Sequence, residues 1–203
     1  MKVKIILPAV GLAALAVAGV VFWGAGNTPV AAAVEVGEPM PGFTLNDIYG
    51  KERKLSDFSG KIVVIEFCSQ ECPFSRGSDP HLSALAKQYA GQGVVVLGID
   101  SHHGTTPEAI KKYSEEKGKT YPILKDTGNG YADAAGAKVT PEVFVVDQKG
   151  NVAYHGAFDN RKSPDEKGDI PYVENAVKAL LDGKPVDPKT VKAWGCSIKR
   201  APK

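Results

Sequence analysis

Apolar residues along the chain fall into two kinds of pattern. Runs rich in β-branched residues at 61–67 and 94–99 are typical of strands that are buried on both faces. Between them, the apolar residues of 82–89 follow the i, i+3, i+4, i+7 spacing of one helix face, and Gly91 and Gly93 end that helix. This part of the chain therefore predicts a strand, a helix and a second strand, in that order.

The second half of the chain continues this alternation and then changes it. A helix is predicted over 107–117, with Thr106 as its N-cap. Strands at 143–146 and 152–154 flank a four-residue hairpin loop, and a last helix is predicted over 171–181. This order of elements predicts one α/β domain, in which helices flank a central sheet with parallel and antiparallel parts.

The N-terminal end has the features of an export signal. A 19-residue apolar stretch, 5–23, follows Lys2 and Lys4, and a small-residue site of the A-x-A type ends at Ala33. Because the stretch approaches the ~20 residues that span a bilayer, it is either a cleaved signal peptide or a membrane anchor that tethers the protein. In both cases we expect residues 34–203 in the periplasm or another extracytoplasmic space.

Composition and charge narrow the classes of function. Hydrophobic residues make up 43% of the chain and charged residues 24%, which excludes wholesale disorder and a multi-span membrane protein. Residues 34–203 carry 23 basic and 23 acidic side chains, because Lys2 and Lys4 are the only charged residues before Glu35. A domain without net charge has no broad basic surface for nucleic acid, so no nucleic-acid partner is expected. Three cysteines are too few for a disulfide-dense scaffold.

Cys72 is the leading candidate for chemistry. It lies between the strand at 61–67 and the following helix, and helix N-termini stabilise a thiolate through unpaired N–H groups and the helix dipole. Glu66 lies within the same buried strand, where desolvation raises the pKa of a carboxyl group. A thiol beside such an acid suits nucleophilic and acid–base chemistry. The alternatives are an inert buried cysteine and a glutamate on a solvated strand face.

A series of short motifs surrounds this segment. In chain order they are Gly37-Glu38-Pro39-Met40-Pro41-Gly42-Phe43-Thr44-Leu45, Leu55-Ser56-Asp57-Phe58, Gly60-Lys61 and Val139-Thr140-Pro141. In this order and spacing they resemble the thioredoxin-like redoxins of the AhpC/TSA type, over nearly all of residues 35–185. The resemblance implies a thioredoxin-like fold with an N-terminal β extension, in which Cys72 is the attacking cysteine and Glu66 the buried acid that exchanges protons. It also implies that the Thr140–Pro141 bond is cis and faces the active cysteine.

Together with the patterns at the two ends, the resemblance divides the chain into three segments. A signal peptide or membrane anchor occupies 1–33, the thioredoxin-like domain occupies 34–185, and a C-terminal tail that contains Cys196 occupies 186–203.

The active-site motif departs from the family pattern. Cys72-Pro73-Phe74-Ser75 is C-x-x-S, so the usual resolving thiol is absent, and Glu71 stands in place of the usual tryptophan. Pro141 falls where true peroxiredoxins have the arginine that steadies the peroxide, and Arg76 is the available partial substitute. The residues expected to face the substrate are Thr140, Pro141, Pro73, Ser75 and Arg76.

Two other cysteines are candidates for the second thiol. Cys68 is near Cys72 in sequence and is slightly favoured for a fast intramolecular bridge. Cys196 lies in a polar, mobile-looking tail that is long enough to reach across the domain, and it is favoured for a slower or intersubunit bridge. The tail segment Gly195-Cys196-Ser197-Ile198-Lys199 also resembles a peroxiredoxin-like branch of the family.

A second reading is a copper-binding chaperone. The C-x3-C-P spacing of Cys68, Cys72 and Pro73 resembles the Sco-type copper proteins, and thiolates are soft ligands. His102 and His103 follow the second strand and are the candidate imidazole ligands, although the Sco-type histidine position holds no histidine here. A third reading is a thioredoxin fold that has lost turnover.

The interpretation that fits the residues best is an exported thiol-based oxidoreductase that needs no cofactor. Cys72 attacks a protein or small-molecule disulfide, or a peroxide. Cys68 or Cys196 then resolves the product, and an external thiol reductant regenerates the enzyme.

Overall fold

The computed structural model describes Met1 and residues 33–202. The predicted signal or anchor segment 5–23 lies outside these residues. Across 33–202, no helix combines the length and the apolar character that crossing a bilayer requires.

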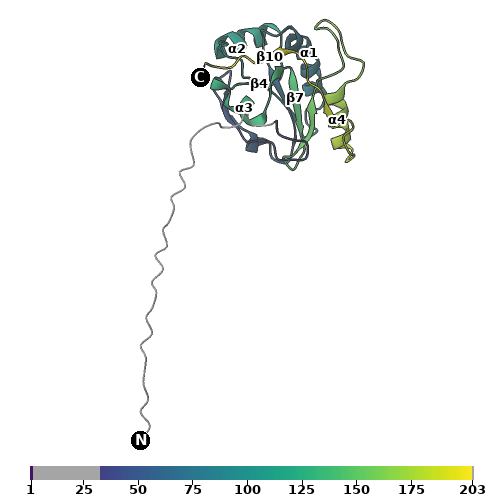
Figure 1. Cartoon of the computed structure of the whole chain (residues 1–203). Helices are drawn as coiled ribbons and strands as arrows, with labels where there is room; N and C mark the ends of the chain where they lie inside the picture. Colours follow the sequence, from purple (N-terminus) through teal and green to yellow (C-terminus); the bar gives the residue numbers. More distant parts are fainter. Residues whose placement is uncertain (2–32, 203) are drawn as a thin grey trace.

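An eight-stranded mixed sheet forms the centre of the domain (Figure 1). Its strand order is β2-β1-β5-β4-β3-β7-β8-β9; β3, β4 and β5 are parallel, and β7 is antiparallel to β3. The antiparallel β1–β2 hairpin joins the sheet through β5, as an N-terminal β extension. The strands of this sheet are β1 (Thr44–Asp47), β2 (Glu52–Lys54), β3 (Ile62–Cys68), β4 (Val94–Asp100), β5 (Ile123–Lys125), β7 (Glu142–Val146), β8 (Val152–Gly156) and β9 (Thr190–Val191).

Helices cover both faces of this sheet. They are α1 (Pro73–Gln88), α2 (Pro107–Glu116), α3 (Gly130–Ala135) and α4 (Tyr172–Leu181), with short 3₁₀ turns η1 (Leu55–Phe58) and η2 (Thr127–Asn129). The crossovers from β3 through α1 to β4 and from β4 through α2 to β5 run in the same direction across the sheet. Because such crossovers are right-handed, α1 and α2 share one face, to which α4 is added. Helix α3 covers the other face.

Strand β3 is buried along its whole length. Its side chains alternate, so Val64 packs with α1 and α4, whereas Ile65 and Phe67 pack with α3 on the opposite face. The same alternation places Glu66 and Cys68 on the face that α1 covers.

The element boundaries predicted from the sequence are close to the observed ones. The Thr106 side chain caps α2 by accepting a hydrogen bond from the Ala109 N–H at 3.2 Å, as predicted. At α4, Pro171 is the N-cap residue, so the helix begins one residue later than predicted.

The C-terminal tail is an ordered part of the domain, whereas the sequence suggested a mobile segment. Strand β10 (Cys196–Ser197) pairs antiparallel with β6 (Val139–Thr140), and this pairing places Cys196 opposite Thr140. Ile198 is buried in the α3-side core, and its N–H donates to the Lys138 carbonyl oxygen at 3.0 Å. The polarity of the tail concealed this docking, because Ile198 is the one buried apolar side chain within 187–202, and hydrogen bonds and ion pairs with distant parts of the chain supply further contacts.

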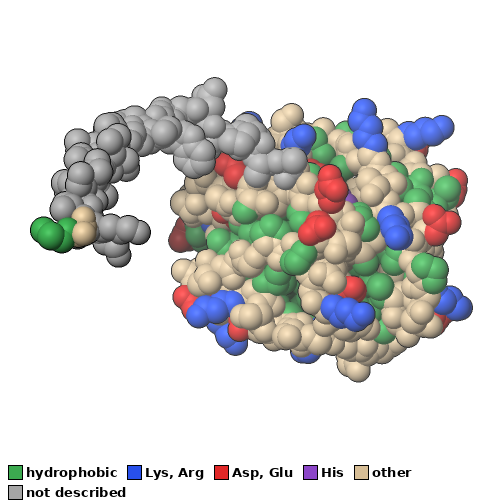
Figure 2. Space-filling view, turned by 60° about the horizontal axis from the view of Figure 1, so that its bottom comes forward, with side chains coloured by type: hydrophobic (Ala, Val, Ile, Leu, Met, Phe, Trp, Pro, Cys, Tyr) green, Lys and Arg blue, Asp and Glu red, His purple; other side chains and the backbone are tan. Residues whose placement is uncertain are grey.

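Charge is distributed evenly over the surface seen in Figure 2. Lysine and arginine side chains are interspersed there with aspartate and glutamate, and apolar side chains lie between them. This mixture follows from the equal numbers of basic and acidic residues, and it produces no extended field of one sign on this face.

We predict that Gly195→Ala releases β10 without unfolding the domain. Gly195 has a φ of 145°, and a Cβ at this position would collide with the Thr140 carbonyl oxygen. Limited trypsin digestion should therefore cleave faster after Lys199 and Arg200, while the thermal midpoint changes little. Gly42→Ala is the control, because a Cβ there meets nothing within 4 Å. Equal cleavage of Gly195→Ala and the parent would contradict the role of Gly195 in docking the tail.

Candidate active site

Cys72 occupies the N-cap position of α1, immediately after the loop that leaves β3. Pro73 follows as the first helical residue, a position at which a backbone N–H has no helical partner and its loss costs nothing. Cys72 therefore lies at the N-terminus of α1, as the sequence predicted, and the backbone of Ser75 in the first turn lowers its pKa. Cys72 itself is only 2% exposed.

The sulfur of Cys72 lies against the loop that begins β7. In its thiol form, Cys72 Sγ donates a hydrogen bond to the Thr140 carbonyl oxygen at 2.9 Å. The Thr140–Pro141 peptide bond is cis, as predicted. Burial raises the pKa of Cys72, but hydrogen bonds with Cys196 and Thr140 and with the backbone of Ser75 outweigh it, and the net pKa lies below its ordinary value. The site thus favours a thiolate at Cys72.

Cys196 is the cysteine that the structure brings to Cys72. The pairing of β10 with β6 places it opposite Thr140, whose carbonyl oxygen lies 2.9 Å from Cys72 Sγ. Burial and the neighbouring Cys72 raise the pKa of Cys196 to about 11, although Arg76 opposes the shift. The pKa of Cys72 is therefore lowered and that of Cys196 raised, so Cys72 is the thiol of the pair that ionises first.

Cys68 lies inside the core at the end of β3. A Cβ placed on Gly98 of β4 would come within 3.1 Å of Cys68 Sγ, so the thiol faces the neighbouring strand. Burial raises the pKa of Cys68 well above its ordinary value, with only Lys119 acting in the opposite direction. Cys68 is thus a protonated core residue, and the geometry favours Cys196 over Cys68 as partner of Cys72, the reverse of the order that sequence distance suggested.

Glu66 is a fully buried acid behind the cysteines. Ser78 of α1 donates a hydrogen bond to Glu66 Oε1 at 2.7 Å. Desolvation is the main reason that the pKa of Glu66 rises to about 8, and the negative charge of Asp79 adds to it. The predicted buried acid is therefore protonated at neutral pH.

A polar cluster around Asp79 lies on the same face of the sheet and was not predicted from the sequence. Lys119 Nζ lies 2.6 Å from Asp79 Oδ1, and the hydroxyl groups of Tyr113 and Tyr121 donate to Asp79 at 2.8 and 3.3 Å. These groups come from α1, α2 and the segment that leads into β5, so no short sequence motif contains them all. The only signal in the sequence was a polar residue, Asp79, on the inward side of a helix.

The residues expected to face the substrate divide into two groups. Pro73 and Arg76 are exposed beside Cys72. Thr140 and Pro141 are buried, because β10 covers them. Ser75 is also buried: its hydroxyl accepts the Ser69 N–H at 3.1 Å, so its backbone rather than its side chain reaches Cys72.

The two histidines of the copper reading are held by other contacts. His102 is buried with its Nε2 3.2 Å from Glu71 Oε2, and the exposed His103 donates its N–H to the Lys199 carbonyl oxygen at 2.9 Å. In the part of the chain that the structure describes, no three or more histidine, cysteine, aspartate or glutamate side chains are grouped to hold a metal ion.

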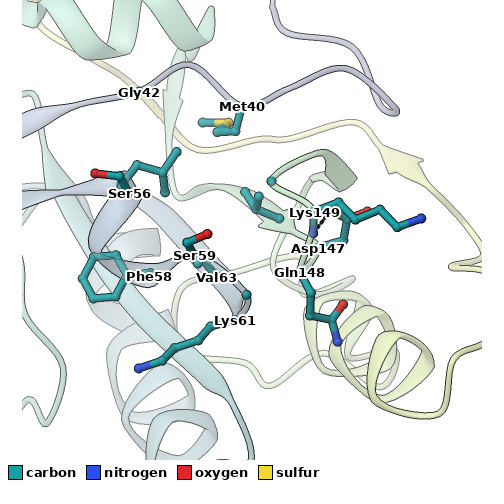
Figure 3. A pocket seen from close by; sticks show the side chains of 14 residues that line it. Met40, Gly42, Ser56, Phe58, Ser59, Lys61, Val63, Asp147, Gln148 and Lys149 are labelled. Atoms are coloured by element: carbon teal, nitrogen blue, oxygen red, sulfur yellow. Dashed lines mark hydrogen bonds between the residues drawn. The ribbon is translucent and has the colours of Figure 1, made fainter.

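One cavity lies away from the cysteines. It has a volume of about 230 Å³ and is formed at the start of β3 and the β7–β8 turn, where Lys61, Asp147 and Lys149 surround it (Figure 3). Cys72 follows the other end of β3, so this cavity is separate from the cysteine site.

The chain is similar to known redoxins in sequence and in fold. The model of the AhpC/TSA family matches residues 36–155. The thiol-disulfide oxidoreductase ResA of Geobacillus thermodenitrificans is 32% identical over 120 residues, which cover 59% of this chain and 68% of that protein.

Two solved structures extend the comparison to the fold. A hypothetical protein of Sinorhizobium meliloti has a TM-score of 0.79 at 31% identity, over 84% of this chain and 97% of that one. The thioredoxin domain of a thiol-disulfide oxidoreductase of Bacteroides vulgatus has a TM-score of 0.56 at 21% identity, over 61% and 89% of the two chains. With its thioredoxin-like fold and its matched domain, the chain belongs to the AhpC/TSA family and is a thiol-based oxidoreductase.

Proposed function

We propose that the protein reduces disulfides, with Cys72 as the attacking thiolate and Cys196 as the second thiol. The observation that carries this proposal is that Cys72 and Cys196 both lie against Thr140, at the cis Thr140–Pro141 bond: Cys72 Sγ is 2.9 Å from the Thr140 carbonyl oxygen, and Cys196 is the residue paired with Thr140. The pair supplies what the C-x-x-S motif lacks, namely a second sulfur within reach of the first. The similarity to a protein named thiol-disulfide oxidoreductase supports the same class of reaction.

The reaction takes place in two exchanges. The Cys72 thiolate attacks one sulfur of the substrate disulfide, which forms a mixed disulfide and releases one substrate thiol. Cys196 loses its proton and attacks Cys72 Sγ, which forms the Cys72–Cys196 disulfide and releases the second thiol. An external dithiol then reduces this disulfide and is itself oxidised, so that electrons and protons balance over the cycle.

A disulfide is a better substrate than a peroxide for this site. The position of the peroxide-steadying arginine of peroxiredoxins is Pro141 here, and Arg76 is exposed rather than directed at a closed peroxide pocket. A disulfide requires no such positive group, because its leaving group is a thiolate that needs only a proton.

We place this activity outside the cytoplasmic membrane. The support is the apolar segment 5–23 after Lys2 and Lys4, which as a signal or anchor would export residues 34–203. Fractionation of cells that produce the full chain tests this placement, and recovery of the protein in the cytosol would contradict it.

The three cysteines should behave differently when each is replaced by serine. With hydroxyethyl disulfide as oxidant, Cys72→Ser should react at the background rate, because the thiolate is lost. Cys196→Ser should stop at a mixed disulfide on Cys72, because no second thiol reaches it. Mass spectrometry of alkylated peptides distinguishes these products.

Cys68→Ser is the matched control for this series. It should form the Cys72–Cys196 disulfide as the parent does, since Cys68 faces Gly98 in the core. A Cys68–Cys72 bridge in the parent, or full turnover by Cys196→Ser, would overturn the assignment of Cys196.

We predict that Glu66 exchanges protons with the cysteine pair, so that Glu66→Gln changes the pH profile. In the parent, the rate of the second exchange should rise with pH through about 8, because the carboxylate form accepts the proton that the thiol loses. Glu66→Gln keeps an acceptor for Ser78 but cannot ionise. It should lose this rise and react about 10²-fold more slowly at pH 8.

A stability measurement checks the pKa of Glu66 independently of its role. Because the folded-state pKa is raised from 4.5 to about 8, the folded state retains a proton that the unfolded state loses between these pH values. The free energy of unfolding of the parent should therefore fall as pH rises through this window, relative to Glu66→Gln. Parallel curves for the two proteins would show that Glu66 is ionised in the fold.

A further inference from the structure

A groove lies beside the cysteine pair, between the start of α1, the segment after β8 and the C-terminal tail. It has a volume of about 570 Å³, which is within the range of sites for small molecules. Phe74, two residues after Cys72, and Gly195, immediately before Cys196, both contribute to its lining. The groove is therefore lined by close chain neighbours of both cysteines, although neither Cys72 nor Cys196 is part of its wall.

Aromatic side chains form much of its wall. Trp194 packs edge-on against Phe74 with ring centroids 4.9 Å apart, and Tyr172 at the start of α4 is also in the lining. Such rings bind the apolar stems of an organic molecule and exclude water from it.

The charge of the groove is positive. Asp159 is neutralised by Arg161, which contacts it through Nε and Nη2 at 2.8 Å each. Lys162 and Lys192 are exposed in the lining, and neither forms an ion pair with another residue of 33–202. Two uncompensated positive charges therefore face the groove, and both suit carboxylates.

The edge of β6 is closed to a polypeptide substrate. A peptide that reached Cys72 by pairing with Val139–Thr140 would have to displace all of β10, which already pairs there. Contacts beyond β10 also hold the tail: Arg200 Nη1 lies 2.8 Å from Asp133 Oδ1, and the Ala201 N–H donates to Asn129 Oδ1 at 2.7 Å. A small disulfide requires no backbone pairing with this edge.

We infer that the substrate is a low-molecular-weight disulfide whose organic groups carry carboxylates, and that it enters through this groove. This inference rests on the proposed disulfide reduction and specifies its substrate class. The carboxylates lie at Lys162 and Lys192 while Cys72 attacks the sulfur. The reduced Cys72–Cys196 pair gives up two electrons and two protons, one substrate disulfide becomes two thiols, and the enzyme disulfide forms.

A charge series of disulfides tests the inference with the full-length protein. The reduced protein is mixed with oxidised glutathione, hydroxyethyl disulfide or cystamine, which are anionic, neutral and cationic at pH 7, and formation of the Cys72–Cys196 disulfide is followed over time. After each rate is divided by that of the same disulfide with free dithiothreitol, oxidised glutathione should exceed cystamine by about tenfold at low salt. High salt should reduce this ratio.

The variant Lys162→Gln/Lys192→Gln should lose this preference and keep its rate with the neutral disulfide. Lys61→Gln/Lys149→Gln is the matched control, since it removes the same charge at the far end of β3 and should retain the preference. Equal normalised rates for all three disulfides, or loss of the preference in both double variants, would overturn the inference while disulfide reduction stands. Failure of these three disulfides and of insulin alike to oxidise the cysteine pair would overturn the proposed function itself.

Insulin serves as the polypeptide disulfide in a further comparison. The parent should reduce it more slowly than oxidised glutathione, and Arg200→Ala, which loosens the tail, should accelerate only the reaction with insulin. Reduction of insulin by the parent as fast as that of oxidised glutathione would overturn the inference.

Discussion

Strand β3 is hydrogen-bonded to β4 on one side and to β7 on the other, and helices cover both of its faces. A strand held in this way has a fixed register and a fixed end, so the residue that follows it has little freedom. Cys72 takes its position from that end and from the helix that begins there. β7 brings Thr140 and Pro141 to the same edge, and the tail adds Cys196 to them. The active site is thus an outcome of how the centre of the sheet packs.

The two thiols of the site have opposite pKa shifts. Burial raises the pKa of Cys72, but Cys196, Thr140 and the Ser75 backbone lower it more, whereas burial and the neighbouring Cys72 raise the pKa of Cys196. In the proposed reaction, attack by Cys72 removes the charge that helps to raise the pKa of Cys196. Glu66, buried with a raised pKa, is the nearby group able to exchange the proton of Cys196 near neutral pH. The order of the two exchanges that we propose therefore follows from the opposite pKa shifts of the two thiols.

Most of the fold could be predicted from the sequence, because β3, β4 and α2 have strong local patterns and clear ends. Cys72, Glu66 and the cis Thr140–Pro141 bond were also identifiable, since a strand-to-helix turn and a family motif surround them. The docking of the tail was not, because it depends on a pairing with β6 that is 56 residues away in sequence and on the missing side chain of Gly195. The Asp79 cluster could not be predicted either, because the side chains that contact Asp79 come from separate elements and only tertiary packing brings them together.

The contacts that hold the tail have a consequence for the redox potential. A docked tail keeps Cys196 at a high effective concentration next to Cys72, so closing the intramolecular disulfide costs little chain entropy. By thermodynamic linkage, the free energy that docks the tail also favours this disulfide over the mixed one and over two free thiols. Contacts remote from sulfur, such as Arg200 with Asp133, therefore contribute to the potential at which the enzyme accepts electrons. The reduction potential of the reductant that the protein requires therefore depends partly on how tightly its C-terminal residues bind α3.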